Sequence, residues 1–264
     1  MLEGIKSVKS LIRLNESGLV GMLVHQCVLL VVSGYHNHIS ARGPRTGRSL
    51  RGFELRLFAM DGMDELSALA HEAVEAFEAL LKRGQVEQPP EQPLACRAGC
   101  AHCCYQPEVT VTAIELFRVA DYVVAHFSPD QIATLTSGAT AKPVLPTASS
   151  DTWVLRACPL LVDGACSVYE ARPLVCRSIN SYAVSDCERA RRQNRQQPTI
   201  RTYGPQERAG YLTLDMLQQG IAATGREAQL LNLAPALAIA LSDDSAKQRW
   251  LDGEQVFEAA WATL

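Results

Sequence analysis

The stretch Cys96–Cys104 reads CRAGCAHCC and places four cysteines within nine residues. Buried structural cysteines rarely reach this density, whereas a metal site requires it, because one short loop can then wrap a single ion. Tetrahedral zinc takes four nitrogen or sulfur ligands, and a cubane iron–sulfur cluster takes four thiolates. The adjacent Cys103 and Cys104 point their side chains apart, so we expect them to serve two metals, or one as a ligand and the other beside the site. This stretch predicts a metal centre around which the fold is organised.

Four further cysteines lie downstream, and Cys27 stands apart from the group. Eight thiols suffice for two four-cysteine sites. The predicted metal ligands are Cys96, Cys100, Cys103, Cys104, Cys158, Cys166, Cys176 and Cys187. A four-thiolate zinc centre carries a net negative charge, so nearby cations stabilise it, and we expect Arg172 and Arg177 to have this role.

Other uses of eight cysteines have to be weighed. They could form four disulfides in an exported protein, or be inert buried thiols. A core of this size needs no disulfides, and the export signal is poor, so metal binding is favoured. The spacing Cys96-x3-Cys100-x2-Cys103 is also used by radical enzymes that leave one iron of a cubane open for S-adenosylmethionine. Those enzymes are built on repeated strand–helix units, which this sequence lacks. The choice between zinc and iron stays open.

Composition and charge exclude several classes of protein. Of the 264 residues, 47% are hydrophobic and 20% are charged, which rules out a disordered or low-complexity chain. The formal net charge of -3 argues against a uniformly basic nucleic-acid-binding protein. A basic run follows Cys187 and comprises Arg189, Arg191, Arg192, Arg195 and Arg201. It has no aromatic residue for base stacking until Tyr203, so we interpret it as a solvated helix face and do not expect nucleic acid as a partner.

The N-terminal segment differs in charge from the remainder. Residues 1–59 contain eight Lys or Arg and three Glu, a balance of +5. The apolar run 19–32 is interrupted by His25 and Gln26 and makes a poor signal peptide. At 14 residues it is also shorter than the roughly 20 that a membrane-spanning helix needs. We expect residues 1–59 to be a non-native extension or a disordered segment, and the protein to be cytoplasmic without membrane contact.

The remaining sequence predicts a mainly α fold, in which helices bracket an irregular cysteine-rich centre with a short β-hairpin. Apolar residues recur at helical spacing over 66–81, which indicates a helix from Asp61 or Asp64 to Gly84. The proline-rich residues 88–93 then act as a stiff linker.

Capping signals and a turn signal place the next elements. Thr112 and Glu115 form a capping box for a second helix, Ser128 with Pro129 starts a third, and residues 141–152 are expected to form a loop. The dipeptide at 163–164, Asp-Gly, predicts a hairpin turn that places Cys158 and Cys166 on facing arms.

Two or three helices are predicted beyond Gly204, with breaks at Pro235 and at residues 243–244. We therefore expect a single domain over 60–264, with the metal-binding centre at 94–190 and the C-terminal helices at 205–264.

The combined pattern resembles the YkgJ-type cysteine-cluster family over residues 94–190. The resemblance rests on Cys96-x3-Cys100-x2-Cys103-Cys104, Cys158-Pro159-x-Leu161, Cys166-x-Val168-Tyr169-x-x-Arg172-Pro173-x-x-Cys176-Arg177 and Cys187. That family is described as a zinc- or iron-chelating domain and also takes in flagellin lysine N-methylases. The resemblance implies a metal site formed by the eight matched cysteines. The methylase branch has larger chains, and this one has no glycine-rich loop after a strand to hold a methyl donor, so that activity does not carry over.

The sequence therefore predicts a metal-binding protein that holds zinc or iron, as an ion or as an iron–sulfur cluster, in a structural, carrier or sensor role. One alternative is an iron–sulfur enzyme such as a protein lysine N-methylase. A second is an exported, disulfide-bonded protein. The sequence indicates no catalytic residue, substrate or protein partner.

Overall fold

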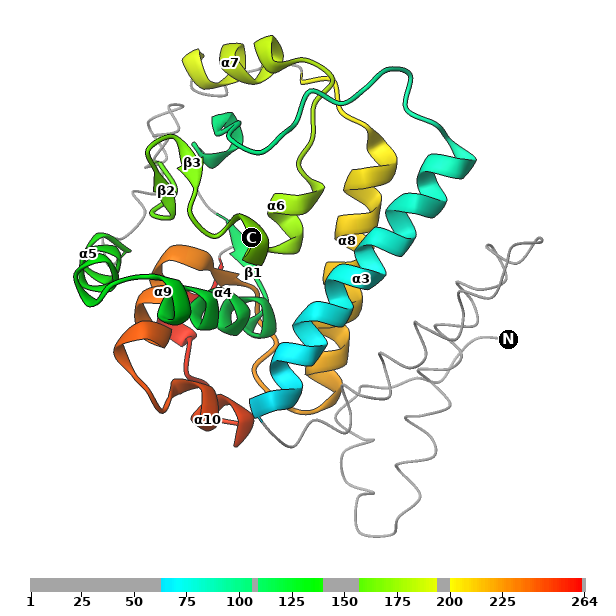
Figure 1. Ribbon diagram of the computed structural model, residues 1–264. Coiled ribbons are helices and arrows are strands. Elements are labelled where there is room, and N and C mark those ends of the chain that lie inside the picture. Colours follow the sequence, from blue (N-terminus) through cyan, green and yellow to red (C-terminus); the bar gives the residue numbers. More distant parts are fainter. Residues whose placement is uncertain (1–62, 106–108, 140–156, 194–199, 263–264) are drawn as a thin grey trace, which may run out of the picture. The chain divides into compact units, whose positions relative to one another are not determined.

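The computed structural model describes residues 63–105, 109–139, 157–193 and 200–262. Its first helix, α3 (Met63–Glu87), packs along α8 (Gly204–Ala223), and the two run side by side in Figure 1. The prediction that this first helix ends at Gly84 is wrong. A Cβ at Gly84 would lie 2.8 Å from the Cβ of Pro205, so this glycine allows the close approach of α8 and does not end the helix.

The two predicted capping signals are confirmed. In α4 (Ala113–His126), Thr112 Oγ1 accepts a hydrogen bond from the Glu115 N–H at 3.4 Å, and the Glu115 carboxylate accepts one from the Thr112 N–H at 2.9 Å. In α5 (Pro129–Ala139), Ser128 and Gln131 make the same reciprocal pair of bonds. The loop expected at 141–152 lies outside the described residues.

The predicted hairpin is confirmed, with one change in the facing residues. Strands β2 (Leu161–Val162) and β3 (Ala165–Cys166) pair antiparallel. Asp163 and Gly164 have φ values of 49° and 75°, as a tight two-residue turn between twisted strands requires. Cys166 lies opposite Leu161 in the register, so Cys158 precedes the strand pair and is not on the facing arm.

Among the described residues, three α-helices follow residue 203, namely α8, α9 (Leu233–Ser242) and α10 (Ala246–Leu251). Residues 243–244 separate α9 from α10 as predicted. The predicted break at Pro235 is wrong, because this proline lies in the first turn of α9. Backbone N–H groups in the first turn make no hydrogen bond within the helix, so the missing N–H of proline costs nothing there.

Shorter elements connect the long helices, and the sequence did not predict them. Strand β1 (Thr110–Val111) pairs antiparallel with β4 (Leu231–Asn232). The others are η3 (His102–Cys104), η4 (Tyr169–Ala171), α6 (Leu174–Ser178), α7 (Val184–Arg192) and η5 (Glu258–Ala260).

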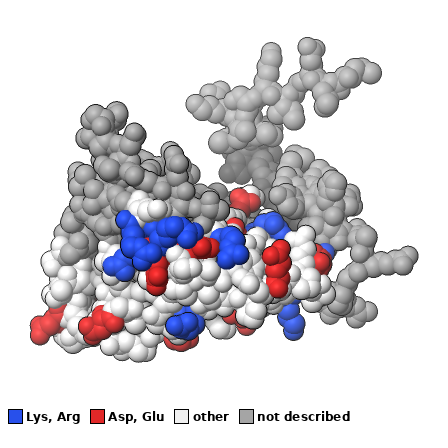
Figure 2. All heavy atoms as spheres, turned by 90° about the horizontal axis from the view of Figure 1, so that it is seen from above, with Lys and Arg blue, Asp and Glu red and all other residues white. Residues whose placement is uncertain are grey.

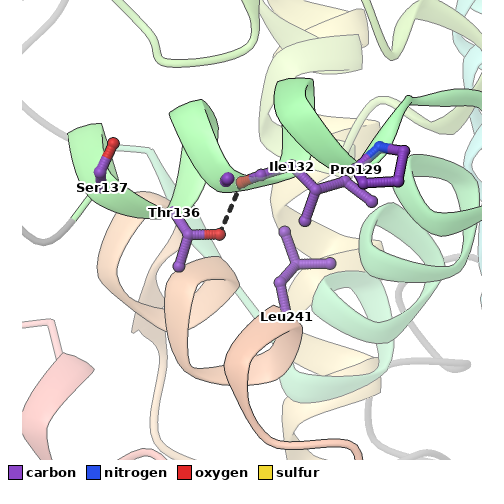
Figure 3. Close-up of a pocket in the computed structure, with 6 residues that line it drawn as sticks. Pro129, Ile132, Thr136, Ser137 and Leu241 are labelled. Atoms are coloured by element: carbon purple, nitrogen blue, oxygen red, sulfur yellow. Dashed lines mark hydrogen bonds between the residues drawn. The ribbon is translucent and has the colours of Figure 1, made fainter.

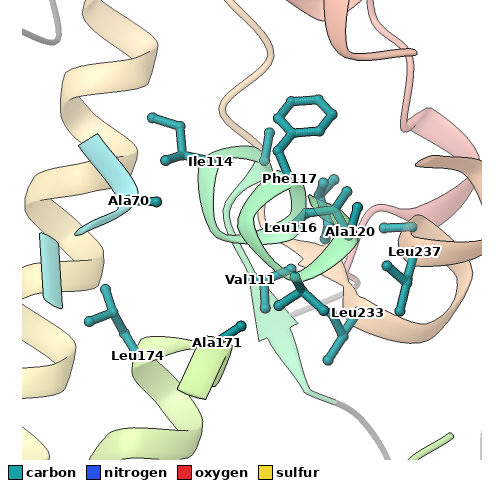
Figure 4. Packing of buried hydrophobic residues seen from close by; sticks show 14 of the residues in the cluster. Ala70, Val111, Ile114, Leu116, Phe117, Ala120, Ala171, Leu174, Leu233 and Leu237 are labelled. Atoms are coloured by element: carbon teal, nitrogen blue, oxygen red, sulfur yellow. The ribbon is translucent and has the colours of Figure 1, made fainter. Parts of the chain in front are cut away.

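Helix α4 lies in the middle of the apolar core. Figure 4 shows its side chains among residues from β1, α3, α6 and α9, including Val111, Ala70, Leu174, Leu233 and Leu237. The Phe117 ring meets the fully buried Trp250 of α10 edge to face, with 5.6 Å between the centroids. Such a pair adds about 1 kcal/mol to the effect of burial. The mainly α fold class is confirmed, and no described helix is long and apolar enough to cross a bilayer. The predictions about residues 1–59 lie outside the described residues.

Candidate metal centre

The first four cysteines lie on a loop between α3 and β1 that a backbone hydrogen bond ties to a later segment. The Ala95 N–H donates to the Ser181 carbonyl at 2.9 Å, which places Cys96 beside the chain that leads into α7. Gly99 has a φ of 82°, a left-handed conformation that favours glycine, and it turns the loop before Cys100. The turn of η3 then carries the last two cysteines of the loop.

A second group of cysteines gathers where residues 157–166 meet the end of η3. The Cys158 N–H donates to the Cys104 carbonyl at 2.7 Å, and Tyr105 and Ala157 form an isolated β-bridge. The hairpin that follows Cys158 presents Cys166 on β3. Main-chain contacts thus bring Cys104 to a segment distant in sequence that carries Cys158 and Cys166.

Helix α6 carries Cys176, and a buried carboxylate from α4 holds the start of this helix. Glu115 is 5% exposed, and its Oε1 accepts a hydrogen bond from the Leu174 N–H at 2.7 Å. Burial raises the pKa of Glu115, while the bonds from Thr112 and Leu174 act in the opposite direction. The capping box indicated the bond to Thr112, but no sequence signal indicated the bond to Leu174, 59 residues away.

Helix α7 carries the last cysteine, Cys187, and side-chain contacts hold this helix to η3 and to the following segment. The Arg191 guanidinium lies 3.5 Å from the centroid of the Tyr105 ring, a cation–π contact. Asp186 accepts hydrogen bonds from Arg189 at 2.9 Å and from Arg201 at 3.4 Å. The bond from Arg189, with smaller effects from Arg201, holds the pKa of Asp186 below its usual range.

Electrostatic coupling separates the thiols into two neighbourhoods. Burial raises the pKa of Cys96, and the nearby thiols of Cys187, Cys100 and Cys103 raise it further. This first neighbourhood joins the loop before η3 to α7.

The second neighbourhood lies around Cys104. Burial raises the pKa of Cys158 to about 11, and it also raises the pKa of Cys166 and of Cys176. The thiol of Cys103 donates a hydrogen bond to Cys104, which lowers the pKa of Cys104 and raises that of Cys103. The three later cysteines act against ionisation of Cys104 by charge repulsion. Cys103 thus interacts with both neighbourhoods.

This donor set fits zinc or iron in type and number. The eight matched cysteines are not joined in disulfides, and thiolate sulfur is the preferred ligand of structural zinc and of iron–sulfur clusters. Their mutual repulsion opposes ionisation, and a bound cation would reverse this effect. Within the described ranges, no three His, Cys, Asp or Glu side chains are arranged to hold an ion as they stand. Closure around a metal therefore requires some thiols to turn.

The two arginines expected beside the thiols occupy different surroundings. The charge of Arg172 favours ionisation of Cys103 and of Cys166. Its guanidinium also stacks 3.6 Å from the centroid of the Tyr169 ring. Arg177 instead donates to the backbone carbonyls of Arg172 and Glu170, at 2.9 and 2.8 Å. Arg172 therefore acts by its charge on two of the predicted ligands, whereas the hydrogen bonds of Arg177 go to backbone carbonyls.

Two surface features lie apart from the cysteines. An open groove between α5 and α9 is lined by Pro129, Ile132, Ala133, Thr136, Ser137 and Leu241 (Figure 3). None of these described lining residues is ionisable.

The basic run after Cys187 lies partly on α7. Figure 2, which looks down on the end of the molecule that carries α7, shows Lys and Arg side chains gathered there with acidic side chains among them. Arg189 and Arg201 pair with Asp186, and Arg192 lies 3.9 Å from Glu188. Arg195 lies outside the described residues. Three described arginines of this run, Arg189, Arg192 and Arg201, therefore have acidic neighbours, as on a solvated helix face, while Arg191 stacks on the Tyr105 ring.

Comparison with known proteins identifies the cysteine-rich segment. A family model described as "CxxCxxCC: Putative zinc- or iron-chelating domain" matches residues 95–199. Neither a curated protein nor a solved structure matches the chain. The matched residues include all eight cysteines of the two neighbourhoods. The chain thus contains a segment, about two-fifths of its length, that matches the model of the CxxCxxCC zinc- or iron-chelating domain.

Proposed function

We propose that the eight cysteines form two four-thiolate centres for zinc or iron in a cytoplasmic metal-binding protein. The first centre consists of Cys96, Cys100, Cys103 and Cys187, and the second of Cys104, Cys158, Cys166 and Cys176. The centres have a structural role or serve a carrier or sensor of the metal.

The observation that carries this division is the pair of backbone attachments around η3. The hydrogen bond from Ala95 to Ser181 joins the first cysteine segment to the approach of α7. The bond from Cys158 to Cys104 joins the end of η3 to the hairpin. The segment that begins at Cys96 and the end of η3 at Cys104 therefore connect to different parts of the chain, as expected if they serve different ions.

The assignment of Cys103 to the first centre rests on its contrast with Cys104, because Cys103 also acts on Cys158, Cys166 and Cys176 of the second centre. Cys103, unlike Cys104, is among the thiols that act on Cys96. Cys104 has the hairpin and α6 cysteines as its main thiol neighbours besides Cys103. Four ligands per centre also satisfy the closed tetrahedral geometry of a structural zinc site.

Single substitutions in the full-length chain test the division. The protein is purified without oxygen, and its metal content is measured by elemental analysis. We expect about two zinc or iron ions per chain if each four-thiolate set holds one ion. Cys187→Ser should abolish the first centre and Cys176→Ser the second, so each variant should keep about half of the metal. The matched control is Cys27→Ser, which changes a cysteine outside the matched pattern and should keep all of it.

Other outcomes would contradict specific parts of the proposal. Complete metal loss in both variants would indicate one shared centre. A protein that contains no metal, and whose cysteines are consumed two at a time by disulfide formation, would favour the disulfide interpretation. Iron with sulfide and a visible absorption band would indicate an iron–sulfur cluster and would bring the enzyme alternative forward.

A further inference from the structure

Two arginines from different helices share one backbone acceptor beside η4. Arg118 of α4 and Arg177 of α6 each donate from Nη2 to the Glu170 carbonyl oxygen, at 2.9 and 2.8 Å. The two nitrogens therefore lie within 5.7 Å of each other, the sum of these two lengths. Both side chains are partly exposed, so the fold holds two like charges close together at a place that solvent reaches.

In the part of the chain that the structure describes, no carboxylate oxygen lies within 4.0 Å of a nitrogen of either guanidinium. Glu78 and Glu170 act on Arg177 from a greater distance, and Glu115 and Glu170 act likewise on Arg118. Burial lowers the pKa of Arg177, and the charge of Arg118 lowers it further, as expected for two cations that repel each other.

Hydrogen-bonding capacity also remains on both side chains. Arg118 makes one bond, from Nη2, and Arg177 makes two, from Nε and Nη2. Each guanidinium carries five N–H groups. Among the described residues, Nη1 of both arginines therefore has donors that no protein acceptor uses.

The negative charge of the thiolates does not account for this pair. Arg172 is the arginine whose charge acts on Cys103 and Cys166. Arg118 and Arg177 are not among the leading influences on the pKa of any cysteine described above. The pair thus has positive charge, unused donors and access to solvent, and its position is fixed by contacts with the backbone.

We propose that Arg118 and Arg177 form a subsite for an oxyanion, the phosphate or carboxylate group of a ligand. Guanidinium groups bind both groups with strong, charge-assisted hydrogen bonds, and two held in fixed positions lose little conformational entropy on binding. The bound anion would also offset the repulsion between the two cations. This subsite is separate from metal binding by the cysteines and does not depend on the proposed division into two centres.

Titration calorimetry on the full-length protein as isolated tests the subsite, with inorganic phosphate and acetate as two separate probes. The better probe identifies which oxyanion the subsite prefers. Arg118→Gln removes one charge but keeps an N–H donor for the Glu170 carbonyl. We expect it to weaken binding of the preferred anion about tenfold, because a charge-assisted bond is replaced. Glu170→Gln keeps that carbonyl and removes a nearby negative charge, so it should tighten binding severalfold.

Arg192→Gln is the matched control, since it removes an arginine that is 71% exposed on α7 and should leave the affinity unchanged. The proposal would be overturned if neither anion gave a saturable one-site isotherm, or if the Arg118 and Arg192 variants weakened binding equally. A folding defect in Arg118→Gln would leave Glu170→Gln as the deciding variant, and unchanged affinity in that variant would also overturn the proposal. Metal content, measured on the same samples, separates this result from failure of the metal-binding proposal.

Discussion

Replacement of Glu115 by glutamine should destabilise the protein although the side chain keeps its size. The carboxylate accepts three hydrogen bonds, from the Leu174 N–H at 2.7 Å and from the N–H and Oγ1 of Thr112 at 2.9 Å each. These bonds satisfy backbone donors at the starts of two helices, α4 and α6. Glutamine has one acceptor oxygen, so its amide nitrogen must face one of the two backbone N–H groups.

A buried backbone donor without an acceptor costs about 1–3 kcal/mol, and we expect Glu115→Gln to lower the free energy of unfolding by about this amount. Glu115→Ala removes both acceptors and should cost about 2–5 kcal/mol, because relief of the carboxylate's desolvation offsets part of the loss. Thr112→Ala should cost only about 1 kcal/mol, since it removes the cap of α4 and leaves the bond to Leu174 intact.

Urea unfolding followed by tryptophan fluorescence, with metal in excess, measures these differences. Glu75→Gln is the matched control, because this glutamate lies on the exposed face of α3 beside His71 and its loss should change stability by less than about 0.5 kcal/mol. The reasoning is refuted if Glu115→Gln is as stable as the Glu75 variant. Metal content of the Glu115 variant should also fall, because the start of α6 positions Cys176.

Three further predictions concern packing, pH and metal binding. Gly210→Ala should lower the free energy of unfolding by about 1–3 kcal/mol, because the new Cβ would overlap the Cβ of Ser178. Adding Ser178→Gly to this variant should restore much of the lost stability, and additive losses in urea unfolding would contradict this. Asp243 accepts hydrogen bonds from Ser245 and Arg249, which hold the pKa of this carboxyl below its usual range. The ionised carboxylate therefore stabilises the folded protein above about pH 4, and this stabilisation is lost as the pH falls through the lowered pKa of Asp243 in the folded state. The stability difference between wild type and Asp243→Asn should therefore shrink on acidification below about pH 4, and growth of that difference would contradict the assignment. Zinc binding to the metal-free protein at pH 7 should release protons from ligating thiols such as Cys96 and Cys158, because burial raises the pKa of these thiols and keeps them protonated. A pH indicator measures the release, and its absence would argue against thiolate ligation.

Local signals in the sequence predicted local structure well. The capping box at Thr112 and the turn at Asp163 each depend on residues within a few positions of one another, and both are confirmed. The predicted helix end at Gly84 is wrong because the reason for that glycine is Pro205, which is distant in sequence.

The candidate site shows the same limit. Cysteine spacing indicated a metal centre and its eight candidate ligands, and the family match supports metal chelation. Spacing could not indicate that Glu115 reaches Leu174, or that Arg118 and Arg177 share the Glu170 carbonyl. These contacts join elements whose relative placement depends on packing of the apolar core, which periodicity within one segment does not describe.

The apolar core around α4 has a consequence for how the protein acquires its metal. Helices α3, α4, α8 and α9 pack through aliphatic and aromatic side chains, and the candidate ligands lie on loops and short elements outside these four helices. We expect the four helices to assemble before any ion arrives, with the cysteine segments already attached through Ala95, Cys158 and Leu174. A newly synthesised chain would then be folded before it binds metal, and metal binding would depend on the metal supply and on the cysteines being reduced.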